Sequence, residues 1–559
     1  MNNHIIKTLF LGLAVSTVSL FSACKKYDNP PPVFEEYGTL PSTNARKVLI
    51  IGIDGLAGAE LKKINPATIG SLIANGKYNY EVIADVNAGT IPTWVSLMTG
   101  TSSNKHRVFT DSFRPSPNED EHVTSVIYPN FLYRILETKP DLTTVTVTSN
   151  PTLNRYFNEA ARPVLAGNDA SVKDSVLKVL QNANPSVVLA NFQDVETTGK
   201  KDGYTADVPT FSAAVTKVDG YIAEVLDALK KRKEYNKEEW LVIVTTNRGG
   251  SETSPKAGFI VCSNPNLKSE ALVKKGFNTI AFNNSKIAAV IEKDNGLYDG
   301  GTNKDFTTQV QVKFNNNATW PGFFSKSTDV GGHATTGWTM IYNGGNWEVV
   351  IGGKNNGGGS SLLGGTTVND RKWHTLTLTV KTVGAVRTAK VYTDGVLNRT
   401  TDISGSLNLT TTEPLKIGYR NQDNGGTNLD FNIGDVQYFN VALDDATVKN
   451  NIALQDITKH PNYANLTGFW PVDEGAGALL VNKAPVGYSF KMTGPYRWVG
   501  LGTDIPVSRV PQSMDGISVV TAGPDVTALL YYWLKIPIKP VWDVDGSGWL
   551  SKFEVEFLK

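Results

Sequence analysis

Two side chains in the first hundred residues are suited to chemistry on an anionic ligand. Asp54 directly follows the apolar run of residues 48–53, and Thr90 lies in a turn just before Pro92, where helix-start signals follow. A buried strand that ends in a carboxylate matches the place where α/β sheets build their sites. A hydroxyl at the start of a helix suits an anion, because unpaired backbone N–H groups point outward there. The two residues therefore indicate a site at the carboxyl edge of a parallel sheet.

The elements that must position these residues alternate between strands and helices up to about residue 264. A continuous apolar run in residues 46–55 is typical of a buried parallel strand, and a helical stretch follows at about residues 66–75. Between about residues 264 and 498 the pattern changes to short alternating strands separated by turns rich in Gly and Asn. A helical run at residues 525–534 follows. The sequence therefore predicts an α/β domain, with a mainly parallel sheet flanked by helices, that is interrupted by an all-β sandwich.

Several sequence blocks of the α/β region occur in a fixed order: VLIIGIDG, GTIPTWVSLMTG, KHRV, KVDGYIAEVLDALKKR and WLVIVTTNRGG. Together they resemble the type I phosphodiesterase and nucleotide pyrophosphatase branch of the alkaline phosphatase superfamily. The resemblance covers about residues 46–264 and the C-terminal tail. It implies that Asp54 ligates a metal and that Thr90 is the nucleophile that takes up the phosphoryl group. It also implies two zinc ions, which activate the hydroxyl and hold the phosphate oxygens.

The sequence departs from this family at the positions that the resemblance assigns to zinc ligands. Glu196 stands where the family has an aspartate, and Lys200 stands where it has a histidine. Further along the chain, Asn247 and Arg248 replace another aspartate and histidine. Lysine and arginine are cations, whereas zinc needs neutral imidazoles or anionic ligands. We therefore expect no zinc at these positions.

Histidines are too few and too scattered to rebuild such a site. They are His4, His106, His122, His333, His374 and His460. Two interpretations remain. In the first, a noncatalytic relative keeps the fold and binds an anion in its cleft through Lys200, Arg248 and the helix start near Thr90. In the second, the chain is a metal-dependent phosphodiesterase or phosphatase whose metal ligands come from elsewhere.

The all-β region resembles the laminin-G-like or concanavalin A-like jelly roll. The resemblance is carried by FTTQVQVKF, the strand that contains Trp373 and His374, the YTDG turn and LTGFWPVDEGAGALLVN. It implies a sandwich of the kind that often binds sugars, in which aromatic faces stack on sugar rings. For any single aromatic residue, packing in the core or at its rim is the alternative that we favour. The candidate ligand-binding residues are Trp320, Trp338, Tyr342, Trp347 and Tyr419.

The C-terminal segment WDVDGSGWLSKFEVEFLK has the spacing of a calcium-binding EF-hand loop. Its candidate ligands are Asp543, Asp545, Ser547 and Glu554, with Gly548 at the turn position. Pro540 and Trp542 stand where the entering helix would be, and the phosphatase family often ends in a similar turn. We favour a plain turn and keep calcium as the alternative.

The amino terminus has the features of a bacterial lipoprotein. Lys7 and the apolar run of residues 9–20 indicate a signal peptide over residues 1–23, too short to span a bilayer. Cys24 follows Phe-Ser-Ala and is predicted to become the acylated first residue, followed by a Pro-rich tether to residue 45. A secretory signal cut near Ala23 is the alternative. We predict an outer membrane lipoprotein, on the periplasmic or cell-surface face.

Composition and domain order complete the prediction. The 54 Lys and Arg and 53 Asp and Glu residues give a net charge of +1, with no basic arm that would indicate nucleic acid. We expect a noncatalytic envelope lipoprotein that binds glycans or other extracellular ligands, with an outer-membrane uptake complex as a candidate partner. A phosphodiesterase or phosphatase and an adhesion or structural module remain the alternatives. The expected divisions of the mature chain are 24–45 (tether), 46–277 (phosphatase-like), 278–500 (jelly roll) and 501–559 (phosphatase-like).

Overall fold

Strand β1 (Ala45–Ile53) is buried from Lys47 to its end and lies inside the sheet of the α/β domain. Successive side chains of a strand point to opposite faces of its sheet. Val48 and Ile50 accordingly join one apolar core, and the residues that follow each of them join another. Helices must therefore cover both faces.

The computed structural model describes residues 45–117, 126–159, 162–253, 255–330, 333–353, 361–406, 408–419 and 429–557.

The sheet around β1 has eight strands in the order β10-β2-β9-β6-β1-β5-β3-β4. Strand β1 pairs in parallel with β5 (Val187–Phe192) and β6 (Glu238–Thr245), so the carboxyl ends of these three strands lie at one edge. Only the pairs β2–β9 and β6–β9 are antiparallel among those described. The predicted mainly parallel α/β sheet is confirmed. The other strands are β2 (Gly76–Val82), β3 (Thr144–Thr148), β4 (Arg162–Leu165), β9 (Gly258–Ser263) and β10 (Glu270–Ala271).

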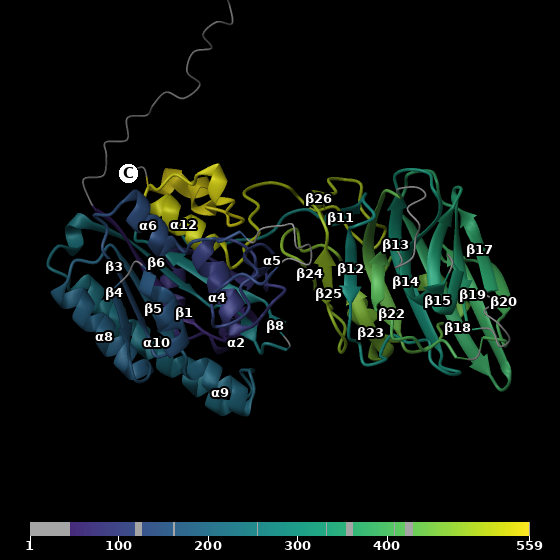
Figure 1. Ribbon diagram of the computed structural model, residues 1–559, viewed down its shortest axis with the longest axis horizontal. Helices are drawn as coiled ribbons and strands as arrows, with labels where there is room; N and C mark the ends of the chain where they lie inside the picture. The colour runs from purple at the N-terminus through teal and green to yellow at the C-terminus, as the bar shows by residue number, and fades with distance from the viewer. Residues whose placement is uncertain are drawn as a thin grey trace, which may run out of the picture.

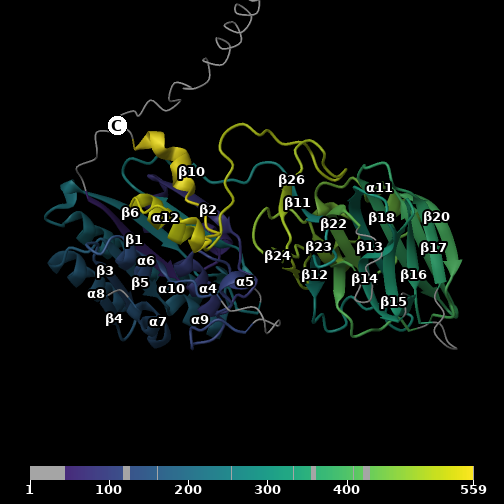
Figure 2. The same cartoon turned by 45° about the horizontal axis from the view of Figure 1, so that its top comes forward.

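Helices cover both faces of this sheet (Figures 1 and 2). Helices α8 (Asp169–Asn182) and α10 (Pro209–Lys230) pack their buried side chains on one face. Helices α4 (Thr90–Thr99), α6 (Phe131–Thr138) and α12 (Asp525–Trp533) pack on the other. The remaining helices of this domain are α2 (Gly58–Ile64), α3 (Ala67–Ile73), α5 (Ser103–His106), α7 (Pro151–Tyr156) and α9 (Asp194–Asp202).

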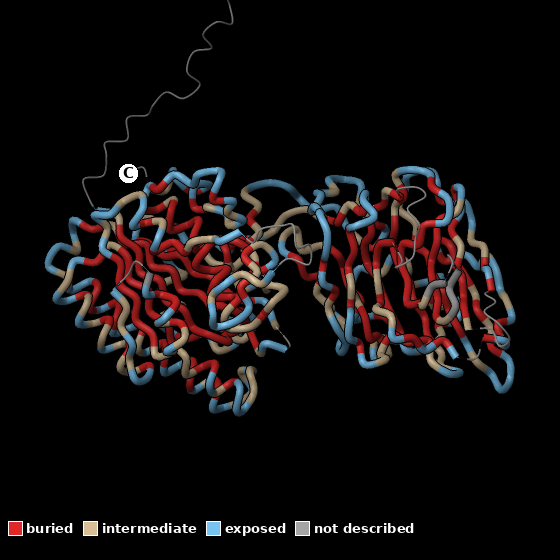
Figure 3. The backbone as a smooth tube through the Cα atoms, viewed as in Figure 1, coloured by how far each residue is buried: buried red, intermediate tan, exposed pale blue. Residues whose placement is uncertain are grey.

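The second body is a sandwich of two antiparallel sheets, as predicted for the jelly roll. One sheet has the order β20-β19-β18-β13-β22-β11-β26 with β23 beside β22, and the other has the order β17-β16-β15-β14-β21-β12-β25-β24. Their facing side chains form one apolar core, and buried backbone fills the middle of both bodies in Figure 3. Helix α11 (Asp445–Asn451) packs at its side, where Val448 is buried with Phe439.

The strands of the sandwich begin at Asn278 and end at Gly500. In chain order they are β11 (Asn278–Phe282), β12 (Ala288–Ile291), β13 (Phe306–Phe314), β14 (Thr319–Val330), β15 (His333–Asn343), β16 (Asn346–Ile351), β17 (Ser361–Thr367), β18 (His374–Val383), β19 (Val386–Thr393), β20 (Val396–Asp402), β21 (Leu415–Gly418), β22 (Phe431–Phe439), β23 (Leu466–Trp470), β24 (Leu479–Leu480), β25 (Phe490–Thr493) and β26 (Trp498–Gly500).

The chain returns from the sandwich to the α/β domain through α12. Thr527 Oγ1 donates a hydrogen bond to the carbonyl oxygen of Leu97 at 2.7 Å, and Trp533 Nε1 donates one to the carbonyl oxygen of Lys47 at 3.0 Å. The sandwich is therefore inserted between two parts of one α/β domain. Among the described residues, no helix is long and apolar enough to cross a membrane.

The two bodies also meet directly. Val86, in the segment that leads to α4, packs against the apolar core of the sandwich. Lys274 Nζ lies 3.1 Å from both carboxylate oxygens of Asp473 on the sandwich side. The contact of Val86 places the sandwich beside the segment that precedes Thr90. Figure 1 shows the two domains side by side.

A buried carboxyl group holds the C-terminal tail. Asp525 accepts hydrogen bonds from the backbone N–H groups of Ala522 at 3.0 Å and Ser547 at 2.8 Å, and from Trp549 Nε1 at 3.2 Å. Burial raises the pKa of Asp525 to about 7 despite these bonds. The folded protein therefore binds a proton here that an unfolded chain has released above pH ~4.

We predict that the pH dependence of stability changes in the Asp525→Asn variant. Because the folded-state pKa lies above the unfolded one, the contribution of Asp525 to the free energy of unfolding is fully present below pH ~4 and is lost as the pH rises to about 7. The difference between wild type and variant should fall by a few kcal/mol over this interval, since each pKa unit is worth about 1.4 kcal/mol. Urea unfolding at several pH values measures it, and a difference that stays constant would contradict the assignment.

Candidate functional site

The candidate site residues of the α/β domain that the sequence predicts lie together at the carboxyl edge of the sheet. Asp54 follows β1, Glu196 lies just beyond β5, and Arg248 lies just beyond β6. Thr90 is the first residue of α4, whose N-cap is Gly89. Parallel strands deliver their ends to the same edge, and for this reason residues that are far apart in the sequence are neighbours here.

Asp54 is buried and surrounded by hydrogen-bond donors. Trp94 Nε1 lies 3.1 Å from both carboxylate oxygens, and Asn191 Nδ2 lies 3.1 Å from Oδ1. Gln193 Nε2 donates to Oδ2. Burial raises the pKa of Asp54 to about 6, while the bonds from Trp94 and Gln193 oppose this rise. The three donors belong to α4 and to the end of β5, and they occupy the side-chain oxygens that a metal would need.

Arg248 lies where the resemblance places a zinc-binding histidine, and it is almost fully buried, with 3% of its surface exposed. Its Nη2 forms an ion pair with Glu196 Oε1, and its Nη1 lies 3.1 Å from Thr90 Oγ1. Lys200 Nζ adds a second contact to Glu196 Oε1 at 3.1 Å from one turn further along α9. The two cations that were expected to receive an anion in the cleft thus share the internal carboxylate of Glu196.

Glu252 completes the site and was missed by the sequence analysis. Its Oε1 accepts hydrogen bonds from Thr90 Oγ1 at 2.9 Å and from the backbone N–H of Thr90 at 3.2 Å. Burial by itself raises the pKa of Glu252, but the Thr90 bonds and the charge of Arg248 outweigh it, so the pKa is lowered. No local sequence pattern points to Glu252, because its partner Thr90 is 162 residues away in the sequence.

Asn247 holds the backbone at this edge. Its Oδ1 accepts from the N–H of Arg248 at 2.8 Å and of Gly55 at 3.4 Å, and its Nδ2 lies 3.2 Å from Thr93 Oγ1. An aspartate could accept the first two bonds but could not donate the third. The amide therefore fits this network, in which its side-chain oxygen and nitrogen both have partners.

These residues do not fit zinc. A zinc ion takes about four ligands from imidazole, thiolate or carboxylate groups. Here a guanidinium contacts Thr90 and Glu196, and donors enclose Asp54. Within the described parts of the chain, no group of three or more His, Cys, Asp or Glu residues could hold a metal ion.

His106, His374 and His460 form no hydrogen bond with Asp54, Thr90, Glu196 or Arg248, and His333 is the first residue of β15. His106 is buried, and its Nε2 lies 3.0 Å from Ser96 Oγ, with burial lowering its pKa to about 4. His374 lies between Asp394 at 2.8 Å and Asp370 at 3.0 Å on the sandwich. His460 is buried against Phe439, and burial lowers its pKa to about 4. His4 and His122 lie outside the described residues.

The structure corrects the set of candidate sugar-stacking residues in the sandwich. Four of them are in its core, where a ring face cannot reach a ligand: Trp338, Tyr342 and Trp347 have no exposed surface, and Tyr419 has 6%. Trp320, at the start of β14, has 49% of its surface exposed. Among these five residues, Trp320 is the one whose ring is accessible to a ligand. The sequence pattern did not separate them, because aromatic residues suit both strand cores and binding faces.

The C-terminal loop is built as a turn. Residues Pro540–Trp542 form a 3-10 turn where an EF-hand has its entering helix. Lys105 Nζ lies 2.9 Å from Asp543 Oδ1 and 2.5 Å from Asp545 Oδ1, and Asp545 Oδ2 accepts from the N–H of Ser102 at 2.8 Å. The backbone N–H of Ser547 donates to Asp525. The ammonium group of Lys105 thus contacts the two carboxylates that would be the first ligands of a calcium site.

The predicted acylation site, Cys24, lies outside the described residues.

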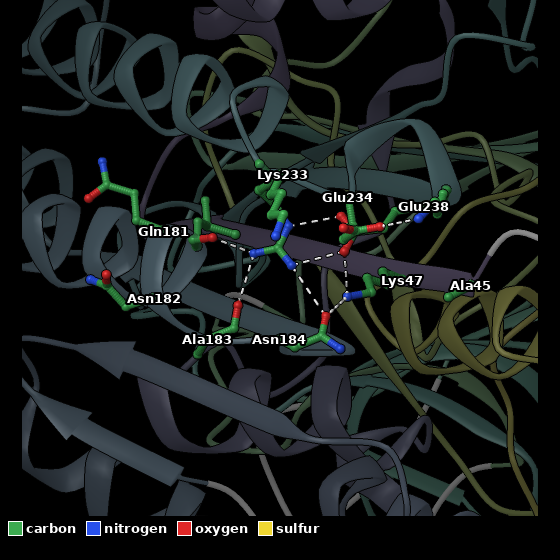
Figure 4. Close-up of a pocket in the computed structure, with 12 residues that line it drawn as sticks. Ala45, Lys47, Gln181, Asn182, Ala183, Asn184, Lys233, Glu234 and Glu238 are labelled. Atoms are coloured by element: carbon green, nitrogen blue, oxygen red, sulfur yellow. Dashed lines mark hydrogen bonds and ion pairs between the residues drawn. The ribbon is translucent and has the colours of Figure 1, made fainter.

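A cavity of about 510 Å³ lies at the opposite, amino edge of the sheet (Figure 4). Glu238 there is held by Lys47 Nζ at 2.8 Å and by Arg232 Nε at 2.8 Å. Trp240 Nε1 donates to the same carboxylate at 2.8 Å. These bonds outweigh burial and lower the pKa of Glu238 to about 2. The buried charges that line this cavity already satisfy one another, which indicates a structural role.

Models of known protein families match both the α/β domain and the sandwich. Residues 48–296 match the family described as type I phosphodiesterase / nucleotide pyrophosphatase, and residues 290–449 match the one described as concanavalin A-like lectin/glucanases superfamily. Residues 456–550 match a domain of unknown function, DUF4983. The resemblances inferred from the sequence blocks are confirmed for the two named families. No curated protein matches the chain.

Solved structures show distant similarity. The binding domain of Paraclostridial Mosquitocidal Protein 1 is 15% identical with a TM-score of 0.26, and the match covers 33% of this chain and 48% of that one. A putative carbohydrate binding protein from Bacteroides ovatus is 13% identical with a TM-score of 0.31, covering 48% of this chain and 71% of that one. A 2-O GAG sulfatase is 12% identical with a TM-score of 0.30, covering 40% and 65%. This chain thus spans less than half of the first structure.

Proposed function

We propose that this protein is a noncatalytic envelope lipoprotein, which keeps the fold of a phosphodiesterase and binds a glycan through its sandwich. The observation that carries the proposal is the position of Arg248. Its guanidinium contacts the hydroxyl of Thr90 and the carboxylate of Glu196, the two groups that a catalytic metal would have to join. A buried cation at this position repels a metal cation and fills its place.

The other substitutions support the same reading. Lys200 brings a second positive charge to Glu196, and Asn247 has no negative charge to offer a metal. Asp54 is held by Trp94, Asn191 and Gln193. Each side chain that differs from the family has at least one protein partner at this edge. The hydroxyl of Thr90 then lacks the metal that would activate it as a nucleophile.

Glycan binding is supported by the family of the sandwich and by Trp320. That family is described as including lectins, and an exposed indole can stack on the face of a sugar ring. Just beyond the end of β13 and five residues before Trp320 in the sequence, Asn315 Nδ2 contacts Asp430 Oδ1 at 2.9 Å and Asn432 Oδ1 at 3.0 Å. Such groups form hydrogen bonds with sugar hydroxyls.

The membrane anchor is part of the proposal. Cys24 is its acylation site, and the tether that follows leads to β1 of the folded domain. A protein held in this way can present its sandwich to glycans at the periplasmic or cell-surface face, beside an outer-membrane uptake complex.

The first prediction from this proposal concerns metal and turnover. Protein from residue 25 onward, dialysed after exposure to zinc and calcium, should retain well under one equivalent of either ion, because Arg248 and Lys105 contact the would-be ligands. Elemental analysis measures this, with hydrolysis of bis-p-nitrophenyl phosphate as the second readout. Retention of about two zinc ions together with turnover would establish the alternative, a metal-dependent phosphodiesterase.

The second prediction concerns the sandwich. Replacement Trp320→Ala should weaken glycan binding about two- to tenfold, since aromatic stacking contributes about 0.5–1.5 kcal/mol. A glycan array followed by calorimetry on the best ligand measures it. Tyr133→Ala is the matched control, because Tyr133 is 44% exposed on α6 of the other domain. If wild type binds no glycan but captures a protein partner, the adhesion alternative replaces this part of the proposal.

The third prediction concerns the anchor. Cells that express the full chain and are fed an alkyne fatty acid should label the wild type, and the Cys24→Ala variant should lose the label and leave the membrane fraction. Cys262→Ala is the control, because Cys262 is buried in β9 and out of reach of acylation. Release of both proteins from the membrane with equal ease would favour an ordinary secretory signal.

A further inference from the structure

The loop of residues 535–542, which follows helix α12, exposes apolar side chains although it is anchored near both of its ends. Ile536 and Trp542 are 3% and 4% exposed, and they pack in the apolar core of the α/β domain. The N–H of Ile536 also donates to the carbonyl oxygen of Tyr531 at 2.8 Å. Between these anchors, Ile538 has 42% and Val541 has 83% of its surface exposed. The loop therefore presents two aliphatic side chains to solvent on a fixed support.

Helix α6 lies along this loop. The guanidinium carbon of Arg134 lies 4.8 Å from the centre of the Trp542 ring, at the end of the loop. Lys139 Nζ donates a hydrogen bond to the carbonyl oxygen of Leu534 at 2.7 Å, just before the loop begins. One end of α6 thus contacts the end of the loop, and the residue that follows α6 contacts its beginning.

The same helix adds two exposed side chains to those of the loop. Tyr133 is 44% exposed and Leu136 is 51% exposed. They are three residues apart in α6 and so share one face of it. Clusters of exposed apolar side chains on a soluble domain mark interaction sites, because leaving them in water is unfavourable. We call the four side chains the apolar patch: Tyr133, Leu136, Ile538 and Val541.

Basic side chains outnumber acidic ones in the segments that carry the apolar patch. Residues 131–142 and 535–542 contain four basic residues, Arg134, Lys139, Lys535 and Lys539, and two acidic ones, Glu137 and Asp141. The next carboxylate along the chain, Asp543, is paired with Lys105 at 2.9 Å. Lys535 and Lys539 are exposed beside the apolar side chains of the loop. Apolar side chains flanked by exposed lysines suit the headgroup layer of a bilayer that contains anionic lipids.

The chain enters the folded domain next to the apolar patch. Ala45, the first residue of β1, lines a cavity of about 240 Å³ together with Lys139 and Lys535. Cys24, the proposed acylation site, precedes Ala45 by 21 residues. A chain of this length reaches about 75 Å at most. A lipid on Cys24 would therefore keep the patch within reach of the bilayer.

We propose that the apolar patch is a membrane-contact surface, which rests in the headgroup layer of an anionic bilayer when the protein is tethered. Ile538 and Val541 enter the layer, and Lys535 and Lys539 contact lipid phosphates. Tethering makes this contact effective, because it gives the patch a high effective concentration at the membrane. The inference goes beyond the proposed function by assigning the face that the α/β domain turns to the bilayer, and it rests on that function only for the lipid at Cys24.

A fluorescent label on the patch tests the contact. The chain from residue 25, which contains every described residue, is held by an amino-terminal hexahistidine tag on vesicles of phosphatidylethanolamine, phosphatidylglycerol and a nickel-chelating lipid. A thiol-reactive dye on Val541→Cys should lose at least about half of its emission when the vesicles also carry nitroxide-labelled acyl chains, because interfacial side chains reach the acyl boundary. Val383→Cys on the sandwich is the matched control, since Val383 is 66% exposed. Cys262 is buried and should not take up the dye.

Reversal of the basic charges tests the lipid specificity of the contact. Lys535→Glu combined with Lys539→Glu should remove most of the quenching at Val541→Cys, because repulsion from phosphatidylglycerol replaces attraction. Lys372→Glu combined with Lys459→Glu is the matched control, since these sandwich lysines have side chains that are 78% and 76% exposed. Thermal unfolding verifies that each variant is folded.

Equal quenching at Val541→Cys and Val383→Cys, or none at Val541→Cys, would overturn the proposal. Neither result bears on the acylation of Cys24, because the tag holds the protein in this assay and the fatty acid label tests the anchor separately. A dye at Val541→Cys that is already shielded without vesicles, in a dimer detected by light scattering, would overturn the proposal in favour of a second copy of the chain.

Discussion

The buried ion pair between Arg248 and Glu196 is the constraint on which the site depends. A buried charge without a partner is strongly unfavourable, so a guanidinium at the end of β6 requires a carboxylate within reach. Glu196 meets this need from α9, and Lys200 shares the same oxygen. The pair directs Arg248 Nη1 to Thr90, and the remaining positive charge draws in Glu252. One substituted residue thus contacts Thr90, Glu196 and Glu252 together.

The position of the sandwich follows from the segment that precedes α4. Ile83 forms a bridge with Ala522, where the chain has returned from the sandwich, and Val86 packs against the sandwich core. Four residues later the same segment begins α4 with Thr90. The sandwich therefore contacts the segment that leads to Thr90.

The fold and about half of the site could be predicted from the sequence. Strand β1 and helix α12 are revealed by local patterns, and Asp54 and Thr90 stand in recognisable blocks. Glu252 could not be found in this way, because its partner Thr90 is distant in sequence and no spacing rule relates them. The same holds for Lys105, whose contact with Asp545 changes the meaning of a loop with calcium-like spacing.

The sequence by itself determined which residue types are present at the carboxyl edge of the sheet, and therefore that cations stand in place of imidazoles. It also determined both fold classes, because the periods of strands and helices are local properties of a chain. Only the tertiary structure decided how the charges pair and which aromatic rings remain exposed, as Trp320 does and Trp338 does not. Pairing and burial depend on distances between segments far apart in the chain, and these distances exist only once the sheet and the sandwich have packed.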